Sequence, residues 1–121
     1  MDPQLEKRER REAMTVDELA KRFDDEHIEV HLKASAAREY RRNLELFILP
    51  AIGHIRLIDV TRADIAKYHH DWRHRPYQAN RNIEIISNMF NLTELWGLRP
   101  DSTNPRKPIQ EYPEKKRERY F

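Results

Sequence analysis

The stretch YQANRNIEIISNMFNLTELW, residues 77–96, decides the fold because it carries apolar residues on two faces of one helix. Its two apolar stripes, both at helical spacing, are Ile83-Ile86-Phe90 and Ile85-Met89-Leu92-Trp96. A helix that is apolar on two sides must be packed from two sides. The sequence therefore predicts a central helix over 77–96, with Gly97 as its C-cap.

Three further helices are predicted upstream from capping residues and apolar spacing. Thr15 with Glu18 has the pattern of a capping box and starts a helix over 16–31. The apolar face expected for that helix is Val16, Leu19, Ala20, Phe23, His27 and Val30. Thr61 with Asp64 repeats the capping pattern and starts a helix over 62–73, with inward residues Ile65, Tyr68 and Trp72.

The helix between these two is expected to start at Ser35, which can act as its N-cap. Pro50 and Gly53 end it. Its apolar stripe is Ala37, Tyr40, Leu44, Phe47 and Ile48. The chain contains only two glycines, which disfavours an all-β fold because tight hairpins need Gly or Asn. We therefore predict an all-α, compact four-helix bundle.

Charge is distributed unevenly along the 121 residues, although the net charge is only +2. Residues 1–29 are acidic overall, and residues 33–82 are basic overall. Such sorting favours a polyanionic partner. The alternative, a solvated surface with uneven charge, stays open at this point. There is no cysteine, no signal peptide and no apolar run long enough to cross a membrane, which fits a cytoplasmic protein without a membrane partner.

Several motifs, in their order and spacing, resemble the core-binding domain of tyrosine recombinases, the phage integrase family. They are TVDELAKRF, ASAAREYRRNLELFILPAIGHIRLIDVTRADI, QANRNIEIISNMFNLTELWGL and NP followed by KKRER, within residues 15–121. The resemblance implies a SAM-like helical domain that grips one face of duplex DNA at a core attachment site. It also implies a separate C-terminal catalytic domain on the other face, and partner recombinase subunits in a tetrameric synapse.

The resemblance suggests a division of the chain into three parts. Residues 1–14 are expected to be a charged extension, 15–104 the DNA-binding domain, and 105–121 a basic interdomain linker. The family's catalytic Arg, His and Tyr motif does not occur in these residues, and Tyr112 and Tyr120 lie in the connector without a general base. We therefore expect no enzymatic activity from this part, and no cofactor or metal. The full-length protein is expected to cut and rejoin DNA.

Candidate DNA-binding residues form three groups. At the start of the second helix, where free N–H groups also favour phosphate, they are Lys33, Ser35, Arg38, Arg41 and Arg42. At the start of the central helix, where amides and Arg can read base edges, they are Gln78, Asn80, Arg81 and Asn82. In the linker, they are Lys115, Lys116, Arg117 and Arg119.

Each group has an alternative interpretation, and for the linker residues it is a disordered charged end. The arginines of the second helix would simply solvate an amphipathic helix, and this chain has Ser35-Ala36 where the family has Ser-Thr. Asn80 would make a buried hydrogen bond that ties its helix to the preceding loop. The histidines include two pairs spaced by four residues, but no third ligand is suitably spaced for zinc. At the level of function, the alternative is a helical protein-interaction domain with a basic face.

Overall fold

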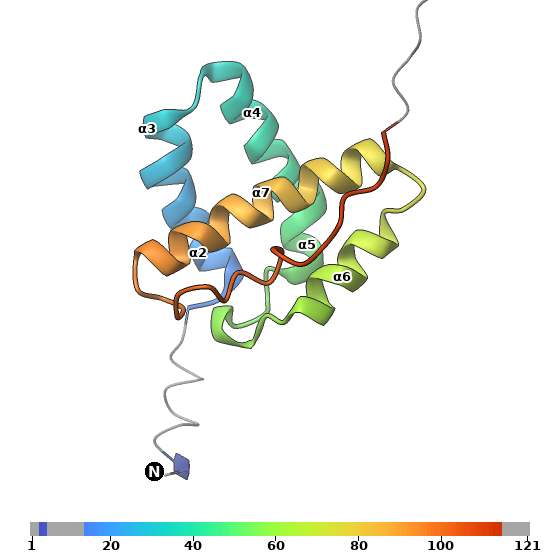
Figure 1. Ribbon diagram of the computed structural model, residues 1–121. Helices are drawn as coiled ribbons and strands as arrows, with labels where there is room; N and C mark the ends of the chain where they lie inside the picture. The colour runs from blue at the N-terminus through green and yellow to red at the C-terminus, as the bar shows by residue number, and fades with distance from the viewer. Residues whose placement is uncertain (1–2, 5–13, 115–121) are drawn as a thin grey trace, which may run out of the picture.

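The computed structural model describes residues 3–4 and 14–114, and the described part is helical (Figure 1). The first long helix consists of α2 (Val16–Phe23), the π-helical η1 (Asp24–Ile28) and α3 (Glu29–His31). The second consists of α4 (Ala34–Asn43), the π-helical η2 (Leu44–Ile48) and α5 (Leu49–Ile52). A 3-10 turn, η3 (Leu57–Asp59), precedes α6 (Arg62–Asp71) and α7 (Pro76–Leu95). The predicted all-α, four-helix architecture is confirmed.

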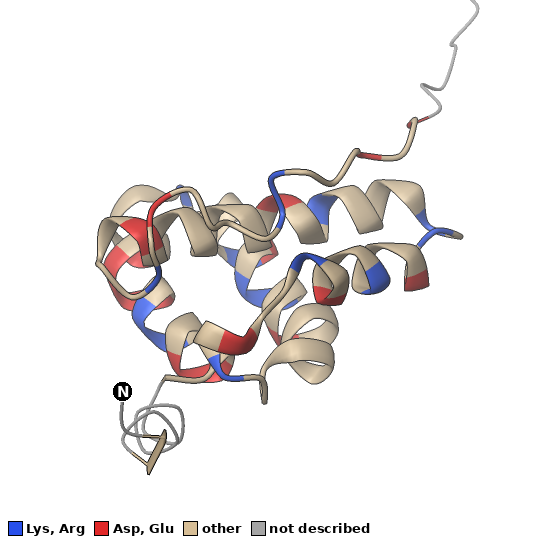
Figure 2. Ribbon diagram, turned by 60° about the horizontal axis from the view of Figure 1, so that its bottom comes forward, with Lys and Arg blue, Asp and Glu red and all other residues tan. Residues whose placement is uncertain are grey.

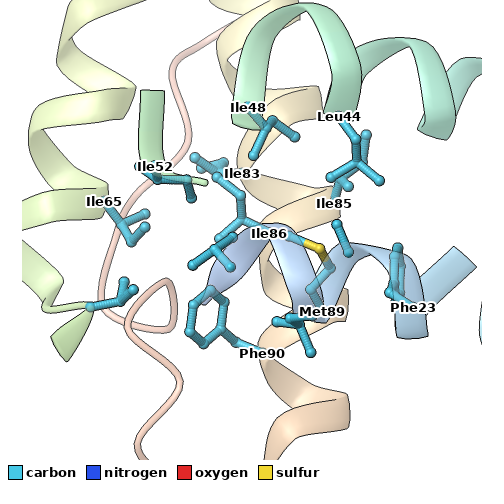
Figure 3. Close-up of a cluster of buried hydrophobic side chains, with 14 of the residues drawn as sticks. Phe23, Leu44, Ile48, Ile52, Ile65, Ile83, Ile85, Ile86, Met89 and Phe90 are labelled. Atoms are coloured by element: carbon cyan, nitrogen blue, oxygen red, sulfur yellow. The ribbon is translucent and has the colours of Figure 1, made fainter. Parts of the chain in front are cut away.

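The core surrounds α7, as the two apolar stripes predicted. Its residues Ile83, Ile86, Met89 and Phe90 are fully buried, and Ile85 is nearly so. Figure 3 shows side chains from α2, the second long helix and α6 converging on them. Leu92 and Trp96, in the last turn and at the C-cap of α7, are only partly buried and pack at the edge of this cluster. Because burial of a large apolar side chain stabilises a fold by about 1.5–3 kcal/mol, this cluster holds the helices together.

The apolar face of the first helix was predicted incorrectly beyond Phe23. Val30, expected inside, is 66% exposed, whereas Ile28 is fully buried. The reason is the π turn of η1, in which backbone bonds close over five residues instead of four. The turn inserts one extra residue, so the face that continues from Phe23 reaches Ile28. A straight α-helix would have kept His27 on that face, and His27 is instead only partly buried, stacked on Phe23.

The predicted N-cap of the second helix was also incorrect. Lys33 is the N-cap, with an extended backbone (φ −65°, ψ 156°), and its side chain makes no capping hydrogen bond. Its carbonyl already accepts from the N–H of Ala37 at 2.8 Å, so Ser35 lies inside the first turn. The chain leaves the first helix at Leu32, whose backbone is extended. The connection is therefore shorter than the Ser35 cap would require.

The helix starts predicted at Thr15 and Thr61 are confirmed. The Thr15 and Thr61 hydroxyls accept from the N–H groups of Glu18 and Asp64, and the Asp64 carboxylate returns the bond. Pro50 does not end the second helix, because it lies inside α5, which continues to Ile52 with Gly53 as the C-cap. Trp96 is the C-cap of α7 in the strict sense, and Gly97 follows it with φ 73°. The N–H groups of Gly97 and of the next residue bond back to α7, which makes a Schellman motif.

Gly53 brings the end of the second helix against the start of α2. Its carbonyl accepts from the N–H of Asp17 at 2.9 Å, and the Ile55 carbonyl accepts from Val16 at 3.0 Å. These bonds satisfy two donors that a helix start leaves free. A Cβ at position 53 would lie 2.6 Å from the Leu49 carbonyl oxygen, so this approach requires glycine.

Residues 99–114, which we call the strap, run back along α7 after its C-terminal turn (Figure 1). The strap begins at Arg99, whose guanidinium donates to the carbonyls of Leu57, Val60 and Thr103. Further on, the Asn104 amide bonds to the Ser87 carbonyl, near the middle of α7. Within the described residues, no helix has the length and hydropathy needed to cross a membrane.

Candidate nucleic-acid interface

A shallow groove of about 490 Å³ lies between α4 and the start of α7. It brings together residues from both predicted helical DNA-binding groups. One wall of the groove carries Arg38 and Arg42, which lie one turn apart on α4. The other carries Arg75 and Gln78, at the start of α7. The remaining lining residues are Glu39, Asn43 and Phe47. We call this feature the basic groove.

Hydrogen bonds between α4 and α7 set the shape of the basic groove. The Gln78 side-chain amide donates to Asn43 at 3.3 Å and to Asn82 at 2.7 Å. Further along, the Asn88 amide donates to the Tyr40 hydroxyl at 2.8 Å. Each of these bonds involves a partly or fully buried polar group, which must be paired to be stable. The two helices are therefore held side by side, and the spacing of the arginines does not depend on a ligand.

The arginines of the basic groove have no acidic partner among the described residues. Arg38, Arg42 and Arg75 are exposed, and none of them takes part in an ion pair there. In Figure 2, basic positions are coloured at the turn that joins α6 to α7. Glu39 is the one carboxylate that lines the groove, so positive charge dominates. Such a surface is suited to a polyanion.

Lys33 is the N-cap of α4 and Ser35 lies in its first turn, and both are exposed. They are close in the chain to the basic groove but do not line it. No side chain caps the N–H groups of this first turn, and free N–H groups at a helix start can bind an anion.

Arg41 is turned away from the groove, toward the first helix. Its guanidinium donates to the Asp24 carboxylate at 2.8–3.0 Å and to Glu29 at 2.6 Å. These hydrogen bonds, first to Asp24 and then to Glu29, raise the pKa of Arg41. The sequence prediction grouped Arg41 with its neighbours, whereas the structure gives it an internal role between α4 and the first helix.

Arg81 lies one turn after Tyr77 on α7, with its side chain half exposed. Its guanidinium carbon is 4.9 Å from the centre of the Tyr77 ring, and one nitrogen donates to Glu84 at 3.0 Å. Hydrogen bonding to Tyr77, and then to Glu84, raises the pKa of Arg81. The guanidinium is thus held in a defined orientation beside an exposed aromatic ring.

Asn80 and Asn82, by contrast, are buried in the structure. Asn82 donates to the Tyr68 hydroxyl at 2.9 Å and accepts from Gln78. Asn80 bonds to His69 in α6 and to Tyr112 in the strap. Asn80 thus makes buried hydrogen bonds, as its alternative interpretation predicted. These bonds tie α7 to the strap and not to the preceding loop. The linker candidates Lys115, Lys116, Arg117 and Arg119 lie outside the described residues.

Three contributors were not singled out from the sequence. Arg75 precedes Pro76, and Pro is common at the first position of a helix. This signal could have placed Arg75 at the start of the central helix, close to Gln78. Phe47 was assigned to the core but also forms part of the groove, with its ring 4.9 Å from Trp72. His69 was not named as a site residue. Burial lowers the pKa of His69, and only the fold could show this.

Comparison with known proteins agrees with this architecture. Residues 15–73 match the family model of the phage integrase N-terminal SAM-like domain. This segment, just under half of the chain, is therefore similar to the N-terminal domain of phage integrases. The match extends from the cap of α2 to just beyond α6, and it concerns the N-terminal domain and not a catalytic one. No curated protein and no solved structure matched the chain.

Within the described residues, no three His, Asp or Glu side chains are grouped so that they could hold a metal ion. A cleft larger than the basic groove, about 690 Å³, lies between α2 and the second long helix. That cleft contains Arg41 with its partner Asp24, so the charges there are already compensated. The basic groove is therefore the better candidate for an anionic ligand.

Proposed function

We propose that this chain is the core-binding domain of a site-specific tyrosine recombinase and that it holds duplex DNA in the basic groove. The family match supports a recombinase context. The observation that carries the proposal is the convergence of Arg38, Arg42 and Arg75 on one groove without acidic partners in the described residues. Phosphate neutralisation by such residues supplies most of the affinity of a protein for DNA.

In this proposal some residues of the groove contact phosphates and another contacts the bases. Arg38, Arg42 and Arg75 neutralise phosphates. Gln78, whose amide nitrogen donates to Asn43 and Asn82, offers its carbonyl oxygen to the base edges. Lys33 and Ser35 add phosphate contacts at the N-terminus of α4. In the full-length protein, a C-terminal catalytic domain would close on the opposite face of the attachment site, and four subunits would assemble for integration and recombination.

The experiment is a fluorescence titration of a labelled duplex of mixed sequence with the 121-residue chain, repeated between about 50 and 200 mM salt. The wild type should bind more weakly as salt increases. The double variant Arg38→Glu/Arg42→Glu should lower the affinity at least tenfold at the lowest salt. It should also reduce the slope of log K against log salt by about 1.8, because each phosphate contact contributes about 0.9.

A matched control uses Lys21→Glu/Lys67→Glu, which changes the net charge equally outside the basic groove. This control should retain the wild-type slope. Equal losses in the two double variants would show that only net charge matters and would reject the groove. Absence of any salt-dependent binding by the wild type would reject direct DNA binding.

The alternative function, a protein-interaction domain with a basic face, gives a different result in the same variants. Charge reversal at Arg38 and Arg42 would then leave duplex binding unchanged. A partner that contacts the first helix would still be bound by the variant. The DNA proposal requires the opposite outcome, in which duplex affinity falls.

A further inference from the structure

The strap does not end freely but is fastened to α6 and α7 by a buried polar cluster. The cluster consists of Asn80 on α7, His69 on α6 and Tyr112 on the strap. Asn80 is only 1% exposed and His69 only 3%. Tyr112 is separated from Asn80 by 32 residues of chain, so this contact is tertiary and not a helix cap.

Asn80 uses its whole hydrogen-bonding capacity in the cluster. Its amide oxygen accepts from the Tyr112 backbone N–H at 2.9 Å and pairs with His69 Nε2 at 3.1 Å. Its amide nitrogen donates to the Tyr112 carbonyl at 2.8 Å and to the Glu114 carboxylate at 3.2 Å. An Asn side chain offers two acceptor positions and two donors, and all four are used here. Asn80 thus binds the strap backbone as a neighbouring strand would.

His69 adds an aromatic contact to the same residue of the strap. The rings of His69 and Tyr112 are stacked, with centroids 4.0 Å apart and planes inclined by 12°. The Tyr112 hydroxyl also donates to the His69 carbonyl at 3.3 Å. Because Asn80 Oδ1 is an acceptor, His69 Nε2 must carry the proton that it donates to it. The strap is therefore held through both its backbone and its side chain.

The preceding part of the strap is ordered by its own contacts. Arg106, whose side chain is 16% exposed, donates to the Ile109 carbonyl at 2.6 Å and to the Glu111 carboxylate at 3.0 Å. Ile109 packs against the core cluster. These contacts guide the chain along α7 until it reaches Tyr112.

We propose that Asn80, His69 and Tyr112 form a latch that fixes where the chain leaves the helical domain. Glu114, the last described residue, bonds directly to Asn80, which lies two residues from Gln78 and next to Arg81. The latch therefore starts the following segment at the end of α7 that carries the basic groove. Asn80 acts as a positioning residue and not as a DNA contact. The positioning role, though not the latch itself, rests on the proposed DNA-binding function.

The latch is tested without DNA by hydrogen exchange of single backbone amides, followed by NMR. The Tyr112 amide, which donates to Asn80, should be protected in the wild type. In Asn80→Ala its protection should fall at least tenfold more than that of Ile86 in the core of α7. Equal losses at both amides, or no loss at Tyr112, would overturn the latch.

Asn82→Ala is the matched control, because Asn82 is a buried Asn on the same helix that bonds to Tyr68 and not to the strap. It should lower protection at Ile86 and Tyr112 together. If Asn80→Ala fails to fold, Tyr112→Leu provides the second variant. It removes the ring stack and the hydroxyl, and it should selectively lower the protection of the amide at position 112.

The positioning role is tested by a double-mutant cycle on duplex affinity. One arm replaces Lys115, Lys116, Arg117 and Arg119 with Gln, and the other is Asn80→Ala. The loss of affinity caused by the Gln replacements should be at least threefold smaller in the Asn80→Ala background. Equal losses in the two backgrounds would overturn the positioning role. If the wild type binds no duplex, the proposed function and the positioning role fail together, while the exchange result still decides the latch.

Discussion

The strap and the basic groove lie on different sides of α7. An arginine side chain is hydrogen-bonded to backbone carbonyls in the strap, whereas the arginines of the groove are exposed. In the strap, the Arg99 guanidinium donates to three backbone carbonyls and lies 5.4 Å from the centre of the Phe90 ring. In the groove, Arg42 is exposed and has no ion pair with any described residue.

The difference follows from the cost of burial. A charged group that leaves water must find acceptors within the protein, or it destabilises the fold. Burial lowers the pKa of Arg99, and the Glu94 carboxylate partly opposes this effect. The exposed arginines keep their hydration and need no internal acceptor, so their donors remain open to a ligand. The polar side chains of the strap therefore serve stability, whereas the exposed arginines of the groove are free for binding.

The largest expected effect comes from breaking the strap side. Arg99→Ala would leave three carbonyls without a donor in a partly buried region, and a single unsatisfied buried group costs about 1–3 kcal/mol. We expect the free energy of unfolding, measured in urea, to fall by about 3 kcal/mol. Duplex affinity, measured where the variant is folded, should be unchanged. A loss of affinity in folded protein would contradict the separation of the two sides.

A smaller effect is expected from Arg42, which can be compared with its neighbour Arg41 on α4. Arg42→Gln should weaken duplex binding several-fold and reduce the salt slope by about 0.9, because one phosphate contact is lost. Its unfolding midpoint should be unchanged.

The neighbouring variant Arg41→Gln provides the matched control for Arg42→Gln. Arg41 pairs with Asp24 and Glu29, so its replacement should lower the unfolding midpoint slightly and leave the salt slope unaffected. The same outcome for both variants would show that the structure does not separate their roles.

The smallest expected effect is a dependence of stability on pH through His69. Burial lowers its pKa, opposed by the hydrogen bond with Asn80; nearby Arg106 lowers it further and Glu111 raises it. His69 thus binds a proton less readily in the folded state than in the unfolded chain, where the pKa of a histidine is about 6.5. The stability contributed by neutral His69 should be complete above that pH and decline as the pH falls below it.

The measurement compares urea unfolding of the wild type and of His69→Gln at about pH 7.5 and about pH 5.5. The wild type should lose more stability than the variant over this range, by less than about 1 kcal/mol. The comparison of the two proteins is needed because the pKa of His27 is also lowered, by burial and by His31. An identical loss in both proteins would exclude His69 as the source.

The helices were predictable because their signals are local. The double stripe of residues 77–96 predicted a buried central helix, and α7 is that helix. The capping pairs at Thr15 and Thr61 involve residues only three apart, and both form. The burial of Ile28 in place of Val30 was not predictable. Spacing rules assume a uniform α-helix, and η1 is π-helical.

The candidate site was predictable only in part, because its details depend on contacts between distant residues. Arg38, Arg42 and Gln78 were named from the sequence, and the fold brings them into one groove. The partner of Arg41 lies 17 residues away and that of Asn80 lies 32 residues away. No pattern in the sequence distinguishes a buried Asn or a paired Arg from an exposed one.

The two π turns have a consequence for how the sequence tolerates change in length. Each of η1 and η2 holds one residue more than a regular helix needs between two buried positions, as between Phe23 and Ile28. Deletion of one residue within Asp24–His27 would restore a spacing of four, which a regular α-helix places on one face. A deletion elsewhere in the same helix would rotate every later side chain by about 100° around the axis. The π turns are thus positions at which this helical domain can lose a residue and keep its core.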